Sequence, residues 1–310
     1  MNVDYMSKSQ CNVIKGVFIL IVFFSHFQQY VSEAGGRVFD IYLGQLMVAM
    51  FLFYSGYGVA ASFAKKGVSY VRDFPKKRIL TTLLNFDIAV AAFIVLDLII
   101  GRPIGACQAL LSFVCWESVG NSNWYIFAII YCYAVAWLFL GVINSRKWGG
   151  ACLFATLAAS VIVLSYIRPI WWCDTMLCFA AGVLFSQYRQ SFERLATRYF
   201  WLLLGAAVLA FLAFRHCGLF ARGLVPNAQA IMFSLMIVMV TMKMPIRGRT
   251  LEWCGERLFP IYIYQRITML ISVTIDPNGF STWHAWLYFS VCLGVTLLIA
   301  KWYHLWQVKL

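Results

Sequence analysis

Long apolar segments recur along the whole chain and are separated by short polar connections. We place them near residues 12–31, 41–63, 79–100, 123–144, 150–167, 171–188, 199–214, 227–243, 258–274 and 284–306. A helix needs about 20 apolar residues to cross a bilayer core about 30 Å thick. Only 12% of the residues are charged, whereas about a quarter are charged in soluble domains. The sequence therefore predicts an all-α fold, a polytopic transmembrane helical bundle of about ten spans.

These spans are expected to form a single integral-membrane domain over residues 1–310, because the connections are too short to hold a soluble domain. Residues 107–115 are apolar but too few to cross, so they are expected to be re-entrant or interfacial. Residues 32–34, Ser-Glu-Ala, are an acceptable signal-peptidase site. We favour an uncleaved first span instead, since 12–31 is long enough to cross the bilayer.

Positive charge gathers in alternate connections. If the N-terminus lies inside, inner segments carry 18 of the 25 lysines and arginines, and outer loops carry five. This asymmetry is how membrane proteins encode orientation, so both termini are predicted to be cytoplasmic. The net charge of +13 is therefore attributed to orientation and contact with the lipid bilayer, and nucleic acid is not expected as a partner.

The ten cysteines are scattered and none forms a Cys-x-x-Cys pair. Most lie in or beside apolar runs, where a free cysteine packs as a small hydrophobe. Neither a disulfide framework nor a metal site is expected.

His26 is an ionisable residue deep in the first apolar span, and Lys15 precedes it by eleven positions. Eleven residues at 100° each bring both side chains to the same side of a helix, roughly 16 Å apart along its axis. Ionisable groups within a span are costly and often functional. Alternatively, Lys15 extends to the lipid headgroups and His26 packs through a hydrogen bond to a neighbouring span.

The second span contains the run Phe51-Leu-Phe-Tyr-Ser-Gly-Tyr-Gly58. Gly56 and Gly58 permit close helix approach or a break in the backbone. The densest positive charge follows at residues 65–78, which either set orientation and contact anionic lipid or bind a polyanionic ligand. Arg78, where the third span begins, is the best single candidate for such a ligand.

Other polar residues lie within or beside spans. Asp87, Asp97, Glu117, Asn121 and Asn123 either orient a histidine, line a polar cavity or pair with a basic residue. The start of the ninth span is also polar, with Glu256, Arg257, Tyr262, Tyr264, Gln265 and Arg266. The remaining histidines, His216, His284 and His304, are interpreted as structural.

Three runs in order, residues 14–26, 51–58 and 76–78, resemble the membrane-bound acyltransferase-3 family, and later landmarks follow at 123–127, 178–184 and 254–264. The resemblance implies a ten-span bundle that moves an acyl group, usually acetyl from acetyl-CoA, to a sugar hydroxyl of a surface glycan. The family's Arg-x10-His signature falls on Lys15 and His26. Gln265 stands where many members have histidine, and the stand-alone form of the family, without an extracytoplasmic domain, is expected.

The mechanistic hypothesis has neutral His26 as general base. Acetyl-CoA would enter from the cytosol with its phosphates near Lys15 and Arg78, aided by Lys76 and Lys77, while a lipid-linked sugar or other glycan acceptor enters from outside. The pocket would be lined by Tyr54, Ser55, Asn123, Trp124 and Glu117. Direct attack and an acyl-histidine intermediate are both open, as are a longer acyl group and the oligomeric state.

The rival class is a multi-pass transporter or flippase, in which His26, Asp87 and Asp97 form a proton or substrate path. No inverted repeat of the kind common in transporters is visible. A third alternative is an inactive, structural homologue. The expected location is a bacterial plasma membrane.

Overall fold

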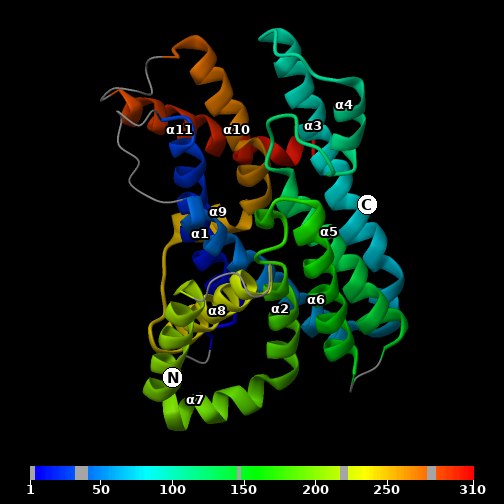
Figure 1. Ribbon diagram of the computed structural model, residues 1–310, viewed down its shortest axis with the longest axis vertical. Helices are drawn as coiled ribbons and strands as arrows, with labels where there is room; N and C mark the ends of the chain where they lie inside the picture. The colour runs from blue at the N-terminus through cyan, green and yellow to red at the C-terminus, as the bar shows by residue number, and fades with distance from the viewer. Residues whose placement is uncertain (1–3, 32–40, 145–147, 217–222, 278–283) are drawn as a thin grey trace. The chain divides into compact units, whose positions relative to one another are not determined.

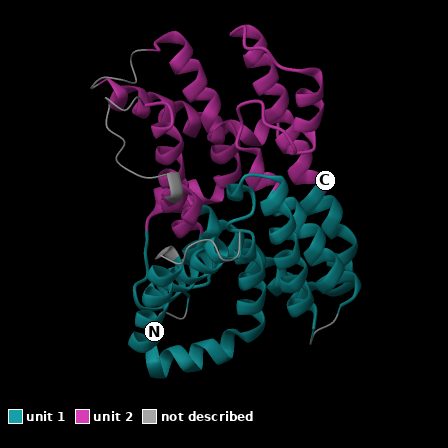
Figure 2. Ribbon diagram, in the orientation of Figure 1, with its two compact units in different colours: residues 1–11, 48–79, 128–247 teal, residues 12–47, 80–127, 248–310 magenta. Residues whose placement is uncertain are grey.

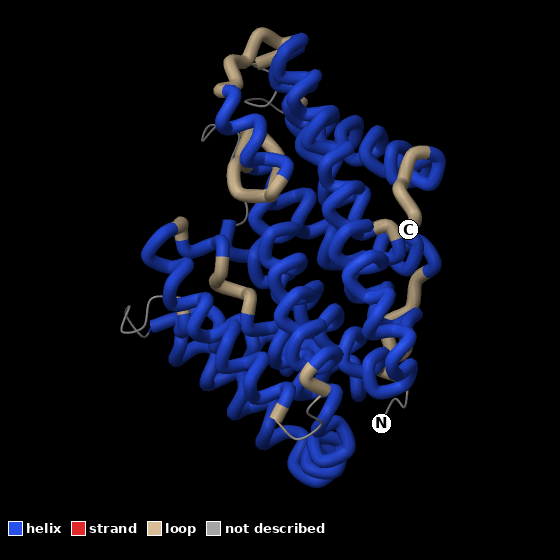
Figure 3. The backbone as a smooth tube through the Cα atoms, turned by 90° about the vertical axis from the view of Figure 1, so that its right-hand side faces the viewer, coloured by secondary structure: helices blue, strands red, loops and turns tan. Residues whose placement is uncertain are grey.

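The computed structural model describes residues 4–31, 41–144, 148–216, 223–277 and 284–310. Helices fill most of these ranges and no strand occurs within them (Figures 1 and 3). The all-α prediction is confirmed. The possible cleavage site at 32–34 lies outside the described residues, as do four basic residues of the charge count and one cysteine, namely Arg37, Arg146, Lys147, Arg222 and Cys217.

The helices follow one another with short connections (Figure 1). Their bounds are α1 Lys8–Gln28, α2 Ile41–Phe74, the π-helical turn η2 Pro75–Leu80, α3 Thr81–Ile99, α4 Ala106–Phe113, α5 Asn123–Ala136, η3 Trp137–Val142, α6 Gly149–Ile167, η4 Ile170–Trp172, α7 Leu177–His216, α8 Leu224–Lys243, α9 Arg249–Glu256, α10 Leu258–Ile275, α11 Ala285–Trp302 and η6 Tyr303–Leu305.

Eight helical stretches of the described chain are long and apolar enough to cross a membrane. Two of them, Leu43–Ile99 with 57 residues and Ile170–Phe214 with 45, each exceed twice the roughly 20 residues that one crossing needs. Each coincides with two predicted spans and is kinked, the first at Gly67 and the second at Tyr188 and Tyr199. The ten predicted spans therefore form eight helical stretches, because the helix continues at two places where a connection between spans was expected. The apolar piece at 107–115 largely forms the eight-residue α4.

The chain divides into two compact units, each made of three separate segments (Figure 2). Unit 1 is Met1–Cys11, Val48–Ile79 and Ala128–Arg247, and unit 2 is Asn12–Met47, Leu80–Phe127 and Gly248–Leu310. In unit 1, α7 packs on α6 and α8, and in unit 2, α10 packs on α3 and α11. The single domain over 1–310 stays a prediction.

In unit 2, α1 is held by apolar packing at one end and by a close backbone crossing at the other. Phe23 and Phe27 both contact the Phe289 ring of α11, with centroids 5.6 and 5.3 Å apart. Further back, a Cβ on Gly16 would lie 1.8 Å from the Leu251 carbonyl oxygen of α9. Only glycine permits so close an approach. These contacts fix the rotation of α1 and therefore the direction in which His26 points.

In unit 1, α2 and α7 cross with equally close backbones. A Cβ on Gly56 would lie 2.0 Å from the carbonyl oxygen of Phe179, and one on Gly182 would lie 2.0 Å from that of Phe53. The packing predicted for the glycines of the second span is therefore confirmed for Gly56. For Gly58 it is wrong, because no atom of the described residues lies within 4 Å of a Cβ placed there.

Gly56→Ala is expected to lower the apparent melting temperature in detergent, whereas Gly58→Ala is the matched control. The added methyl of the first variant meets a backbone carbonyl that cannot rotate away, and overpacking of this kind costs about 1–3 kcal/mol. The second variant fills open space and removes a helical glycine, so it is neutral or stabilises by up to about 1 kcal/mol. Equal melting temperatures for the two variants would show that the crossing is not tight.

Candidate active site

His26 lies in the last turn of α1 and is 8% exposed. The Tyr262 ring of α10 faces it, with the ring centroids 6.1 Å apart. Among the described residues, no group hydrogen-bonds the His26 Nδ1 atom. Buried polar atoms are nearly always paired, so an unpaired one needs an explanation. A ring nitrogen without a protein partner is what a group needs if it is to accept a proton from a ligand.

Three polar side chains of α10, Tyr262, Gln265 and Arg266, share a face because they are spaced i, i+3 and i+4. Pro260 lies in the first turn of α10, where the missing N–H costs no helical bond. Gln265 is fully buried and lies beside His26. Its amide donates to the Tyr262 carbonyl oxygen at 3.0 Å.

Two more buried polar atoms next to His26 make no hydrogen bond of good geometry within the described part of the chain, although Ser122 lies beside one of them. They are the Tyr262 hydroxyl and the Gln265 Oε1 atom. Together with His26 Nδ1 they offer a proton acceptor, a hydroxyl and an amide oxygen in one small polar region. We call these three residues the His26 cluster. Such a set is suited to hold a ligand hydroxyl beside a base.

Arg266 of α10 forms hydrogen bonds to two other segments of the chain. Its Nε atom donates to Ser122 Oγ at 2.8 Å, and its Nη2 atom donates to Gln29 Oε1 at 2.7 Å. Ser122 directly precedes α5, and Gln29 directly follows α1. The Arg266 charge also acts electrostatically on the His26 ring. The guanidinium is therefore fixed in a defined plane close to the candidate base.

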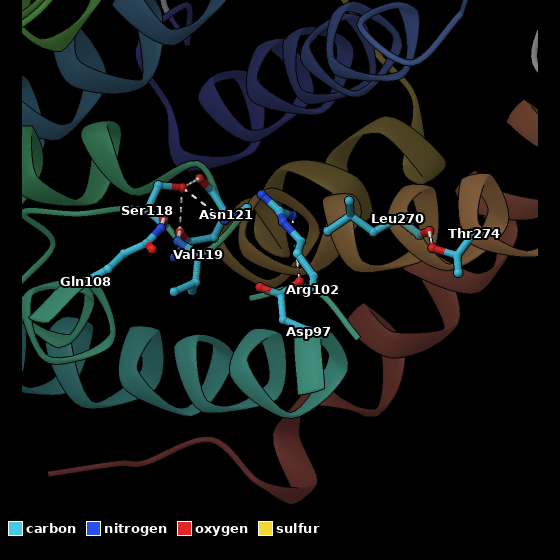
Figure 4. Close-up of polar contacts among 9 residues, drawn as sticks. Asp97, Arg102, Gln108, Ser118, Val119, Asn121, Leu270 and Thr274 are labelled. Carbon is cyan, nitrogen blue, oxygen red and sulfur yellow. Dashed lines mark hydrogen bonds and ion pairs between the residues drawn. The ribbon is translucent and has the colours of Figure 1, made fainter. Parts of the chain in front are cut away.

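The loop that carries Ser122 is held by its own side chains (Figure 4). Asn121 Oδ1 accepts hydrogen bonds from the Ser118 hydroxyl at 3.0 Å and from the Val119 amide at 3.2 Å. Gln108 of α4 donates to the Ser118 carbonyl oxygen at 2.7 Å. Gly120 adopts φ 91°, and Arg102 packs against it. This internal bonding gives the loop one conformation and so fixes Ser122.

Asn123, a predicted substrate-binding residue, is 4% exposed and anchors the same loop. Its Nδ2 atom donates to the carbonyl oxygens of Cys115 at 2.8 Å and Glu117 at 3.0 Å. Trp124 is half-buried and packs edge-on against Tyr125, with centroids 6.3 Å apart. The structure therefore brings Glu117, Asn123 and Trp124 together beside Ser122, while their contact with a substrate stays a prediction.

Asn123→Asp is expected to loosen the loop, because a carboxylate would face two carbonyl oxygens that now accept from an amide. Removing such donors inside a protein costs about 1–3 kcal/mol. The measurement is apparent melting temperature in detergent together with catalytic turnover, and both should fall. Asn144→Asp, at an exposed position of unit 1, is the control. An unchanged melting temperature for Asn123→Asp would contradict the anchoring role.

Cys115, at the start of this loop, is not a candidate nucleophile. Burial, together with the nearby Asp87 carboxyl, raises the pKa of the Cys115 thiol to about 12. A thiol must lose its proton to attack a carbonyl. Cys115 therefore stays protonated at physiological pH and packs as a small apolar residue.

Lys15 is half-buried on α1, between the buried residues Ile14 and Gly16. It precedes His26 on the same unbroken helix, so the predicted separation of roughly 16 Å along the axis holds. Both residues belong to unit 2. The helix thus carries a cation near one end and the candidate base in its last turn.

The other predicted site residues belong to unit 1. Tyr54 is 4% exposed and Ser55 is half-buried. Arg78 lies in the π-helical turn η2 with its side chain beside Tyr70 and Tyr133. Ser55 also lies beside Tyr133. Tyr133 therefore brings two predicted residues, Ser55 and Arg78, to one place within this unit.

The two lysines next to Arg78 are exposed. Lys77 Nζ forms an ion pair with Asp73 Oδ2 at 2.8 Å. Exposed pairs of this type contribute little to stability, typically about 0–1 kcal/mol, so Lys77 is readily released to another anion. A role of Lys76 and Lys77 in binding acetyl-CoA stays a prediction.

The two acidic residues predicted in the third span have different surroundings. Asp97 is 1% exposed and pairs with Arg102, whose Nη1 atom lies 3.6 Å from Asp97 Oδ1 (Figure 4). Of the predicted alternatives, pairing with a basic residue therefore holds for Asp97. Asp87 lies near Cys115. Within the described ranges, no group of three or more His, Cys, Asp or Glu side chains could hold a metal ion.

Unit 1 also contains a cavity of about 840 Å³, lined by α2 around its Gly67 kink, by η3 and by α7. Most lining residues are small or apolar, with Asn144, Ser186 and Gln187 as the polar ones. Tyr54, Ser55 and Arg78 do not contribute to the lining. The cavity is therefore separate from the predicted residues of this unit.

Sequence reasoning selected His26 but not its partners. Tyr262, Gln265 and Arg266 were noticeable as polar residues at the start of an apolar span, and their i, i+3, i+4 spacing was a usable sign of a shared face. Ser122 and Gln29 gave no sign, because single polar residues next to spans are common. The sequence pattern does not indicate which face of α10 is turned toward α1.

The fold and the polar His26 cluster within apolar helices define an integral membrane protein with a candidate acyl-transfer site. The chain belongs to the acyltransferase-3 family, whose profile, described as an acyltransferase domain, matches residues 9–304. The predicted family is thus confirmed over nearly the whole chain, and an acyltransferase activity follows from it. Neither the curated proteins nor the solved structures compared with this chain gave a match.

Proposed function

We propose that this protein transfers an acetyl group from acetyl-CoA to a hydroxyl of a cell-surface or lipid-linked carbohydrate, with His26 as the general base. One observation carries the proposal: His26 is buried, its Nδ1 atom has no partner among the described residues, and it faces the hydroxyl and amide of the His26 cluster. Among the acyl-transfer reactions open to this family, transfer to a hydroxyl oxygen is the one that such a base serves best.

In the proposed reaction, His26 takes the proton of the sugar hydroxyl while the sugar oxygen attacks the thioester carbonyl carbon. The carbonyl oxygen gains negative charge and the C–O bond forms. The C–S bond then breaks, and the leaving thiolate takes the proton from the imidazolium. The products are an acetyl ester and coenzyme A, and the base is regenerated. The alternative, attack by His26 itself to give an acyl-imidazole, uses the same residue.

Acetyl-CoA carries its phosphates far from its thioester, so a cation remote from the base suits it. Lys15 meets this requirement, being half-buried on the same helix as His26 and eleven residues away. Arg78, with Lys76 and Lys77, is proposed as the phosphate-binding group of unit 1. Tyr54, Ser55, Glu117, Asn123 and Trp124 are proposed to contact the two substrates. No metal takes part in this reaction.

The clustering of lysine and arginine supports a cytoplasmic position for both termini, and with it access of acetyl-CoA from the cytosol. With a glycan acceptor at the opposite face, we propose a bacterial plasma membrane as the location. The transporter alternative needs a path of ionisable groups through the membrane, and Asp97 is instead engaged by Arg102.

The test uses purified protein in lipid vesicles, [¹⁴C]acetyl-CoA, and de-O-acetylated surface glycan from a deletion strain. We expect label in the glycan and an equal amount of free thiol, both dependent on the acceptor. Vesicles holding His26→Gln are the control. Thiol release without labelled glycan, or glycan movement across the vesicle without label, would contradict an O-acyltransferase.

A further inference from the structure

Arg266 is a charged residue inside an apolar helix, and no carboxylate of the described residues pairs with it. The two groups that hold it, Ser122 and Gln29, are neutral. A charge at membrane depth is costly unless it is compensated. A bound anion is the simplest compensation.

The guanidinium is arranged to receive such an anion. Two hydrogen bonds from different atoms, Nε and Nη2, hold its plane, and further N–H donors of the planar fork remain. The side chain is half-buried, and its partner Gln29 is exposed, so a ligand can reach it. Arginine held in this way matches a carboxylate or phosphate with two parallel hydrogen bonds.

The position of Arg266 favours the acceptor over acetyl-CoA as the source of this anion. Arg266 lies on the face of α10 that carries Tyr262 and Gln265, and Gln29 is one turn beyond His26 on the chain. The phosphates of coenzyme A are assigned to Lys15, roughly 16 Å back along α1. An anionic group that reaches both the His26 region and Arg266 therefore belongs to the molecule whose hydroxyl His26 deprotonates.

We propose that Arg266 binds a carboxylate or phosphate of the acceptor, so that the substrate is an acidic carbohydrate. This inference rests on the proposed O-acetyl transfer. It makes Arg266 a specificity-determining residue, which selects acidic over neutral sugars and orients the hydroxyl toward His26.

The experiment measures acetyl transfer from [¹⁴C]acetyl-CoA by wild-type protein in lipid vesicles to four forms of de-O-acetylated surface glycan from the deletion strain. These are the untreated glycan, a carboxyl-reduced form, a phosphate-free form and a form treated in both ways. Arg266→Gln and Arg266→Lys are measured beside wild type. Arg257→Gln is the matched control, because Arg257 stacks on Trp253 at 4.4 Å and lies 3.7 Å from Glu256.

We expect wild type to lose at least tenfold in kcat/KM on one treated form, carboxyl-reduced if the anion is a carboxylate and phosphate-free if it is a phosphate. Arg266→Gln should raise KM for untreated glycan at least tenfold, keep most of kcat, and not distinguish treated from untreated glycan. Arg266→Lys should recover part of the preference, and Arg257→Gln should behave as wild type.

Equal transfer by wild type to all four forms would overturn the inference while leaving the acetyltransferase intact. A fall in kcat at unchanged KM for Arg266→Gln would overturn it as well, and would assign Arg266 to the oxyanion of the transition state instead. Absence of transfer to every form would count against the proposed function itself.

Discussion

Replacement of His26 by glutamine is expected to lower the turnover of acetyl transfer by about a hundredfold to ten-thousandfold, the range that a positioned general base contributes. Glutamine has a similar size and keeps a polar end in the buried site, but it cannot take a proton from a hydroxyl. Turnover is measured with purified protein in lipid vesicles and labelled acetyl-CoA, and the affinity for acetyl-CoA should change little.

His304→Gln is the matched control for this substitution. His304 is exposed in η6, its ring lies 6.2 Å from that of Trp302, and it should be dispensable. Both variants are compared with wild type for membrane insertion and apparent melting temperature. Near-normal turnover by a folded His26→Gln protein would remove the base from the mechanism.

Replacement of Lys15 by alanine is expected to raise KM for acetyl-CoA by about tenfold to a hundredfold, since a hydrogen bond to a charged group contributes about 1.5–3 kcal/mol. Turnover at saturating acetyl-CoA should fall much less, because Lys15 is remote from the reacting atoms. Lys15→Arg should keep the affinity or increase it, because a guanidinium can bind one phosphate with two hydrogen bonds.

Lys8→Ala is the comparison for Lys15→Ala, since Lys8 is exposed at the start of the same helix. It removes one charge from the same end of α1 without touching its half-buried part. If Lys15→Ala and Lys8→Ala gave the same KM as wild type, the phosphates of the donor would have to be bound elsewhere, with Arg78 as the next candidate.

Much of the fold was predictable because the hydropathy that a spanning segment needs is set by the surrounding lipid and not by the details of tertiary packing. The α10 segment, predicted at 258–274, is observed as Leu258–Ile275. The breaks within α2 and α7 were not predictable in the same way. Gly67 and Tyr188 interrupt helical geometry without ending the helix, and Pro75 begins a π-helical turn within the stretch where a connection between two spans was expected.

In the candidate site, the sequence alone identified only the residue whose presence in the membrane is energetically unfavourable. An ionisable residue in an apolar span is expensive, and that cost identified His26 directly. The role of Asn123 depends on which backbone carbonyls a folded loop presents to it, and the sequence carries no sign of those bonds. Gly56 and Gly58 show the same limit, since two glycines of one motif face a tight crossing and open space respectively.

Gln265 illustrates how a departure from a family pattern can be informative. It occupies a position where the resemblance to the family leads us to expect histidine. In the structure its side chain is buried beside His26 with an unpaired Oε1 atom among the described residues. An amide oxygen there can accept a hydrogen bond from a substrate hydroxyl, so the position keeps a polar role without a proton to exchange.

The most direct test of the central claim is mass spectrometry of the surface glycan from a deletion strain complemented with wild type or with His26→Gln. Wild type should restore one acetyl group per repeat unit that the deletion strain lacks. The His26→Gln strain should make a polymer of normal length without that group. Loss of the whole polymer in the deletion strain would mean transport, and full acetylation with His26→Gln would contradict the account.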